Sequence, residues 1–84
     1  MNTNAVIKNE SIIRQGFSQI KPGLGDSIDP ITSELTLQEV GIDSVEFFEL
    51  VGFVEDRLNI QLPNKSLSGL KTIGDFDRVI EENK

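Results

Sequence analysis

Apolar residues recur along the chain at spacings of three and four, which is the period of an amphipathic α-helix. The first such run predicts a helix from about Ala5 to Ile20. Its apolar positions are Val6, Ile12, Ile13, Phe17 and Ile20. The segment Lys21-Pro22-Gly23 follows, and a proline just beyond a helical run is a common stop signal. Gly16 weakens such a helix by up to about 1 kcal/mol relative to alanine, so we expect it at a close helix crossing.

The next run of helical periodicity extends from Ser44 to Leu58, behind a turn that contains Gly41. At about 100° per residue, its inward stripe consists of Phe47, Leu50, Val51, Val54 and Leu58. The outward side carries Val45, Phe48, Glu49, Gly52 and Asp56, with Glu46 and Glu55 at its flanks. Asp43 is the predicted N-cap, because its carboxylate can accept the unpaired amide hydrogens of the first turn. Glu46 lies three residues further on and completes the pattern of a capping box.

A long connection from Pro22 to Ile42 separates these two runs. It holds too many apolar residues for a flexible linker: Leu24, Ile28, Ile31, Leu35, Leu37, Val40 and Ile42. We therefore expect the connection to pack across the bundle, with a short helical turn near Leu37–Val40. The spacing of Asp26, Asp29 and Glu34 does not fit the EF-hand pattern. We therefore expect these carboxylates to be solvated loop residues and not calcium ligands.

The last third of the chain predicts an extended segment, a short turn and a final helix. Ile60 and Leu62 are expected to point inward, and residues 66–70 to form a single helical turn. Thr72 is the predicted cap of the final helix. The inward positions of that helix are Ile73, Phe76, Val79 and Ile80.

These elements predict one all-α domain over residues 1–84. Its three main helices and one short helix form a bundle with a long first loop. A chain of 84 residues buries only a modest core. No apolar run approaches the length needed to span a membrane.

Charge narrows the classes of partner. The formal net charge is −6. Residues 1–21 hold three basic residues and one acidic residue, whereas the remainder holds five basic and thirteen acidic residues. Such a surface repels nucleic acids and anionic membranes and attracts basic patches on proteins. We therefore expect protein partners, and neither nucleic acid nor a membrane.

The cysteine count and the amino terminus bear on location. The chain has no cysteine, so no disulfide framework supports the fold. Residues 1–4 lack the basic segment and the apolar stretch of a signal peptide. Both features favour a cytoplasmic protein.

The inventory of reactive side chains argues against an enzyme. Without histidine and cysteine, the chain has neither a Ser–His pair, nor a thiol nucleophile, nor a plausible zinc site. Ser44 has no lysine near it in sequence, and its acidic surroundings disfavour a reactive alkoxide. If Asp43 caps the helix, the Ser44 hydroxyl stays free beside the positive helix end, where a phosphate group is stabilised. Ser44 is therefore better interpreted as the substrate of another enzyme.

Two apolar side chains on the outward face lie next to this serine. A single exposed apolar residue is common on protein surfaces, so the exposure of Val45 or Phe48 alone would need no explanation. Together, beside Ser44, they suggest a docking patch for a partner.

The segment Gly41-Ile42-Asp43-Ser44-Val45, followed by Phe48-Glu49-Leu50, resembles the Gly-x-Asp-Ser-Leu…Val-Glu-Leu signature of acyl carrier proteins. The preceding Leu37-x-x-Val40-Gly41 is similar to the Leu-x-x-Leu-Gly lead-in of that family. The resemblance implies that Ser44, preceded by Asp43, carries 4′-phosphopantetheine, whose thiol holds cargo as a thioester. It also implies a phosphopantetheinyl transferase that uses coenzyme A and Mg²⁺. Departures from the family pattern are Val45, Phe47 and Gly52.

The function predicted on this basis is that of a monomeric carrier. Acyl-loading and acyl-processing enzymes would dock on the acidic helix through basic patches. The residues predicted to contact these partners are Val45, Glu46, Phe48, Glu49, Gly52, Glu55 and Asp56. The dense acidic helix favours fatty acid or polyketide-type biosynthesis over an aminoacyl or peptidyl carrier. A hypothesis from a different class is a small acidic interaction module without covalent cargo.

Overall fold

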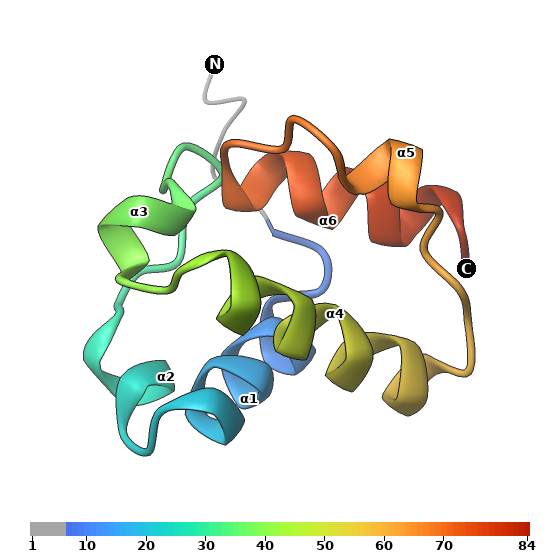
Figure 1. The fold of residues 1–84 in the computed structure, drawn as a ribbon. Helices are drawn as coiled ribbons and strands as arrows, with labels where there is room; N and C mark the ends of the chain where they lie inside the picture. The colour runs from blue at the N-terminus through green and yellow to red at the C-terminus, as the bar shows by residue number, and fades with distance from the viewer. Residues whose placement is uncertain (1–6) are drawn as a thin grey trace.

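The computed structural model describes residues 7–84, and all its regular elements are helices (Figure 1). Their bounds are α1 Glu10–Ile20, α2 Leu24–Ser27, α3 Leu37–Val40, α4 Ser44–Leu58, α5 Asn64–Leu67 and α6 Ile73–Glu82. Across residues 7–84 there is no strand, only an isolated antiparallel bridge between Thr36 and Thr72. The predicted all-α bundle of three long helices is therefore confirmed, and so is the short helix α3. The sequence pattern missed α2.

The core forms between the three long helices, with α4 lying across α1 and α6 above both in Figure 1. The side chains without exposed surface are Ile13, Phe17, Leu50, Val54, Ile73, Phe76 and Ile80. The rings of Phe47 and Phe76 meet edge to face, with 5.4 Å between their centroids. The predicted inward stripe of α4 is confirmed, although its last member, Leu58, is only half-buried.

Gly16 lies at the crossing of α1 and α4, as its position in the helical pattern predicts. A Cβ atom added to Gly16 would overlap Cδ1 of Leu50 and would approach Cδ2 of Phe53 to 3.2 Å. Only a glycine therefore lets the two helices approach this closely. The crossing brings α1 against the middle of α4, at Leu50 and Phe53.

The start of α1 differs from the prediction. The helix begins at Glu10, not near Ala5, and Ala5 and Val6 lie outside the described residues. The buried carboxylate of Asp77 on α6 explains the late start, because it accepts the backbone amides of Lys8 at 3.0 Å and Asn9 at 2.9 Å. The Asn9 side-chain amide adds a third bond to Asp77 at 2.7 Å. Lys8 and Asn9 are thus held against α6 in a non-helical conformation.

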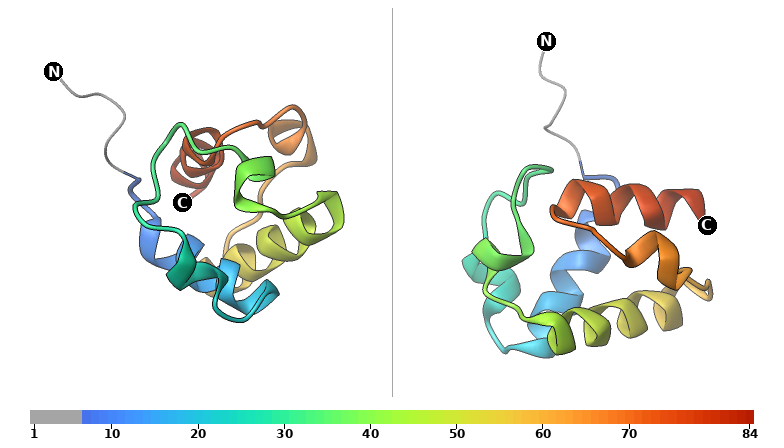
Figure 2. Two further views of the ribbon diagram at one scale, coloured as in Figure 1. Left: turned by 90° about the vertical axis from the view of Figure 1, so that its left-hand side faces the viewer. Right: turned by 45° about the horizontal axis from the view of Figure 1, so that its top comes forward.

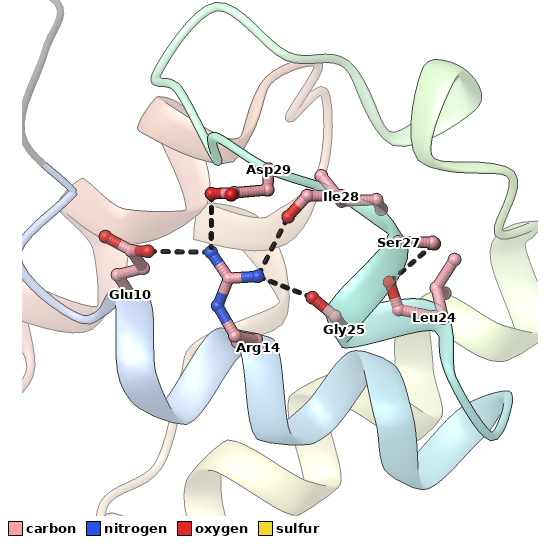
Figure 3. A network of polar contacts seen from close by, with 7 residues as sticks. All are labelled: Glu10, Arg14, Leu24, Gly25, Ser27, Ile28 and Asp29. Atoms are coloured by element: carbon pink, nitrogen blue, oxygen red, sulfur yellow. Dashed lines mark hydrogen bonds and ion pairs between the residues drawn. The ribbon is translucent and has the colours of Figure 1, made fainter.

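The connection between α1 and α4 closes one end of the bundle (Figure 2). Its packing confirms the prediction, since Ile31, Val40 and Ile42 are buried. Arg14 of α1 clamps the beginning of this connection (Figure 3). Its guanidinium donates to the carbonyls of Gly25 and Ile28, and it also pairs with the carboxylates of Glu10 in α1 and Asp29 in the connection. The loop therefore follows the surface of α1 and forms α2.

Backbone hydrogen bonds join the end of the same connection to the start of α6. The amide of Ile73 donates to the Leu35 carbonyl at 2.8 Å, and the amide of Gly74 donates to the Ser33 carbonyl at 2.9 Å. Thr72 caps α6 as predicted, with its hydroxyl accepting the Asp75 amide at 3.1 Å. These bonds fix α3, and with it the turn that leads into α4.

The segment after α4 is extended, as predicted, with Leu62 buried and Ile60 half-buried. The helical turn after it begins earlier than predicted, at Asn64 instead of Ser66. Pro63 is the N-cap of this turn, and its carbonyl accepts the amides of Ser66 and Leu67. Of the helices in residues 7–84, none has the length and apolar character needed to cross a membrane.

Candidate functional site

Ser44 is the first residue of α4, at the end of the turn that follows α3. Gly41 ends α3 with φ 93°, a left-handed conformation that glycine adopts without strain. The Gly41 amide donates to the carbonyls of Leu37 and Gln38. The chain therefore leaves α3 at Gly41 and enters α4 three residues later at Ser44, which is exposed.

The predicted capping box of α4 is present. The Glu46 amide donates to Oδ1 of Asp43 at 2.8 Å, and the Asp43 amide donates to Oε1 of Glu46 at 3.0 Å. Two of the unpaired groups at the helix start are thus satisfied without the serine. The side chain of Ser44 is exposed, and within residues 7–84 its hydroxyl has no hydrogen-bond partner. A free hydroxyl beside the positive end of a 15-residue helix suits a phosphate ester.

Lys21 also belongs to this site, and the sequence pattern did not indicate it. Its ammonium group lies 2.7 Å from the carbonyl oxygen of Gly41 and 3.5 Å from Oε1 of Glu46. Twenty residues separate Lys21 from Gly41, so only the packing of α1 against α4 brings them together. Neither spacing nor residue type in the sequence gives a signal for such a contact.

The outward face of α4 has the predicted orientation. Val45 is 68% exposed and Phe48 is 59% exposed, and they are the large apolar residues with exposed side chains among residues 7–84. Gly52 faces open space one to two turns further along. Gly52 therefore adds no side-chain bulk to the outward face after Phe48. The role of this face in docking stays a prediction.

The four acidic residues of this face differ in their engagement. Glu46 completes the capping box, and Glu55 accepts the backbone amide of Leu62 at 2.8 Å. Glu49 and Asp56 are exposed, and neither carboxylate has a hydrogen bond or ion pair within the described part of the chain. The charges of Glu49 and Asp56 are therefore the ones most available to a partner.

A groove of about 650 Å³ opens directly beside Ser44, between α3, the start of α4 and α5. Its apolar lining consists of Leu37, Ile42, Phe47, Phe48, Leu67 and Leu70. Its polar lining consists of Gln38, Asp43, Ser44, Asn64 and Ser68. The volume lies in the usual range of small-molecule pockets. Sequence reasoning missed this groove, because α5 contributes to it from a part of the chain with no recognisable motif.

The chemistry that this arrangement offers is that of an acceptor. Among residues 7–84, no hydrogen bond links the Ser44 hydroxyl to a basic group that could deprotonate it. The same residues hold no group of three or more acidic, histidine or cysteine side chains that could bind a metal ion.

Comparison with known proteins gives the family. The family described as "Phosphopantetheine attachment site" matches residues 23–79, a range that contains α2, α3, α4 and α5 and most of α6. The acyl carrier protein of Clostridium perfringens (strain 13 / Type A) is 32% identical over 72 residues, which cover 80% of this chain and 95% of that protein. The acyl carrier protein of Streptococcus pyogenes serotype M1 is 32% identical over 59 residues, covering 70% of this chain and 77% of the relative.

A shorter match of higher identity supports the same relationship. The acyl carrier protein of Wolinella succinogenes is 38% identical over 48 residues, covering 57% of this chain and 63% of the relative. No solved structure matched the chain. The chain therefore belongs to the acyl carrier protein family, and it is a non-catalytic carrier whose cofactor is phosphopantetheine.

Proposed function

We propose that Ser44 carries the phosphopantetheine group and that the chain, as one carrier domain over residues 1–84, presents acyl cargo to enzymes of fatty acid or polyketide-type biosynthesis. When bound, the arm supplies a terminal thiol that holds the cargo as a thioester. The observation that carries this proposal is the free, exposed Ser44 hydroxyl at the start of α4, whose helix cap is formed by Asp43 instead. Modification of Ser44 therefore leaves the capping box intact.

The role of this chain in the modification is to hold an acceptor oxygen in place. Ser44 Oγ forms a phosphoester bond with the pantetheine phosphate, while the bond to the nucleotide half of coenzyme A breaks. A phosphopantetheinyl transferase supplies the base that takes the hydroxyl proton, and Mg²⁺ for the phosphates. The unpaired backbone amides in the first turn of α4 stabilise the new negative charge.

Acyl cargo is favoured by the groove beside Ser44. Six apolar side chains line it, from Leu37 in α3 to Leu70 after α5. An alkyl chain that enters this groove removes apolar surface from water, which an aminoacyl group would do less. The names of the relatives in Clostridium and Streptococcus point in the same direction, since both are acyl carrier proteins.

Partner enzymes, we propose, dock on the outward face of α4 through basic patches. The face consists of Val45, Phe48, Glu49, Gly52 and Asp56, with Glu46 and Glu55 at its flanks. Its exposed apolar pair supplies contact area, and its free carboxylates steer a basic partner. A single copy of the chain suffices for this function. The cytoplasmic location of the protein stays a prediction.

The test is an intact-mass measurement after incubation with coenzyme A, Mg²⁺ and a transferase of broad specificity. The wild-type chain should gain the mass of one phosphopantetheine group, and Ser44→Ala should gain none. Ser66→Ala is the matched control, because Ser66 also lies in a helical turn, α5, and it should be modified like the wild type. Modification of Ser44→Ala would refute the assignment, and an unmodified wild type would favour the interaction module without covalent cargo.

The same reaction with octanoyl-coenzyme A tests the cargo. Insertion of the octanoyl chain into the groove should raise the melting temperature above that of the form with a free thiol, because the chain binds only the folded state. A glycyl group on the arm is the control and should leave the melting temperature unchanged. Equal stabilisation by both groups would argue against the groove as an acyl site.

A further inference from the structure

We propose that Lys21 is a positioning residue for Ser44, which holds the turn before α4 in the conformation that the transferase recognises. This inference rests on the proposed function of Ser44. Within the described residues, Lys21 has no hydrogen bond to the Ser44 hydroxyl, and its contact with α4 is the ion pair with Glu46 at the flank of the outward face. It acts on the serine through Gly41 before it and Glu46 after it.

The base of the tether is rigid. Lys21 is the C-cap of α1, and its backbone amide donates to the Phe17 carbonyl at 2.9 Å. Phe17 has no exposed surface, and the close approach at Gly16 fixes α1 against α4. The Lys21 side chain therefore starts from a fixed point beside the turn.

The two contacts of the ammonium group lie on opposite sides of Ser44. On one side it reaches the carbonyl oxygen of Gly41, the residue that ends α3, at 2.7 Å. On the other it pairs at 3.5 Å with Oε1 of Glu46, the same oxygen that accepts the Asp43 amide in the capping box. Lys21 thus joins the end of α3 to the start of α4 across the turn that contains the serine.

The turn needs such a tether because its own residues are largely exposed. Gly41, Asp43 and Ser44 are exposed, and only Ile42 between them is buried. Glycine also has the widest backbone freedom of all residues, so loss of the tether broadens the conformations of the turn. The fraction of molecules with the recognised conformation then falls, and the apparent affinity falls by the same factor.

The effect belongs to recognition more than to global stability. The Lys21 side chain is 46% exposed and that of Glu46 is 25% exposed, and contacts of this kind contribute little to unfolding free energies. The usual free energy of such exposed contacts corresponds to about a fivefold change at most in the equilibrium between the recognised conformation of the turn and its other conformations. We therefore expect Lys21→Met to raise KM for the modification by about three- to fivefold, with kcat nearly unchanged.

The direction of the change in KM distinguishes a positioning role of Lys21 from an effect of its charge on electrostatic steering. Removing a cation makes an already acidic chain more acidic, which strengthens attraction to a basic partner and lowers KM. Lys8→Met is the matched control, because Lys8 is exposed at the opposite end of α1 and its loss changes the net charge equally. Electrostatic steering therefore predicts a KM for Lys21→Met at or below that of Lys8→Met, whereas positioning predicts a higher one.

The experiment measures kcat and KM of the transferase with each of four carrier proteins as the substrate, in the presence of coenzyme A. The four proteins are the wild type, Lys21→Met, Lys21→Arg and Lys8→Met. Hydrogen exchange at the amides of Asp43 and Glu46 is measured in the same four proteins, without a transferase. We expect faster exchange and a higher KM in Lys21→Met alone, and substantial recovery of both in Lys21→Arg, which keeps a charged donor.

Two results would overturn the inference: a KM for Lys21→Met no higher than that of Lys8→Met, or exchange at Asp43 and Glu46 that ignores the substitution. Failure of arginine to restore either quantity would also count against it. An unmodified wild type is a different outcome, because it refutes Ser44 as the acceptor, while the exchange measurement still decides whether Lys21 orders the turn.

Discussion

Truncating Leu50 and Phe48 to alanine separates the core of α4 from its docking face. Leu50 has no exposed surface, and its Cδ1 atom fills the space that a side chain at Gly16 would need. Glycine cannot extend into the cavity that Leu50→Ala leaves, so the site relaxes little. Truncation of a buried leucine costs about 2–5 kcal/mol. The whole fold is worth roughly 4–13 kcal/mol at the usual stability per residue, so this variant loses a large share of it.

Phe48, in contrast, is a surface residue when judged by its exposed fraction. It is 59% exposed, so about two fifths of its side chain is covered. Full burial of a phenylalanine is worth about 1.5–3 kcal/mol, and the covered part therefore contributes about 1 kcal/mol. The covering includes Phe47, whose ring centroid lies 6.0 Å away. Phe48→Ala should stay folded and should instead slow modification by the transferase or reaction with a downstream enzyme.

The assay is a urea denaturation curve for each variant, followed by modification kinetics for those that stay folded. We expect the midpoint of Leu50→Ala to fall far below that of the wild type and that of Phe48→Ala to fall slightly. Equal destabilisation by the two truncations would show that Phe48 belongs to the core and that the facing of α4 is misread. A wild-type rate for Phe48→Ala with every partner tested would remove Phe48 from the docking face.

Two further predictions concern charge. The double substitution of Glu49 and Asp56 by lysine should slow modification, and the wild-type rate should fall with added salt; rates that ignore both changes would contradict steering by these carboxylates. Acid stability should depend on Asp75, whose pKa is held below its ordinary value mainly by the hydrogen bond from the Lys71 amide. Because the folded pKa is the lower one, Asp75 stabilises the fold at every pH above the ordinary pKa of an aspartate, and this contribution is lost as the pH falls through the folded pKa. Unfolding free energies measured against pH should therefore show Asp75→Asn less stable than the wild type at neutral pH, and the gap should close in acid.

The central helix and its cap could be predicted from the sequence because the signals are local. The carboxylate of Asp43, the spacing to Glu46 and the apolar period of α4 all act within a few residues. Gly16 was predictable for a similar reason, since a glycine within an apolar helical run has few other uses. Local rules therefore located Ser44 and the outward face correctly in the fold.

Contacts between distant segments could not be predicted in this way. The late start of α1 depends on Asp77, which lies 68 residues after Asn9 and reads in the sequence as an ordinary charge near the end of a helix. The position of Lys21 over the turn depends on the crossing of α1 with α4. The groove depends on α5, a single turn whose pattern is too short to interpret. In each case tertiary packing, and not local preference, decides the outcome.

The bonds of Asp77 also determine when during synthesis the chain can complete its fold. The amides of Lys8 and Asn9 are made early, but their acceptor is made 68 to 69 residues later, in α6. On the ribosome, α1 and α4 can begin to pack while Lys8 and Asn9 still lack the carboxylate of Asp77. These two residues become fixed only after α6 has emerged and docked. A chain that ends before Asp77 should therefore keep Lys8 and Asn9 unanchored, however well its earlier helices form.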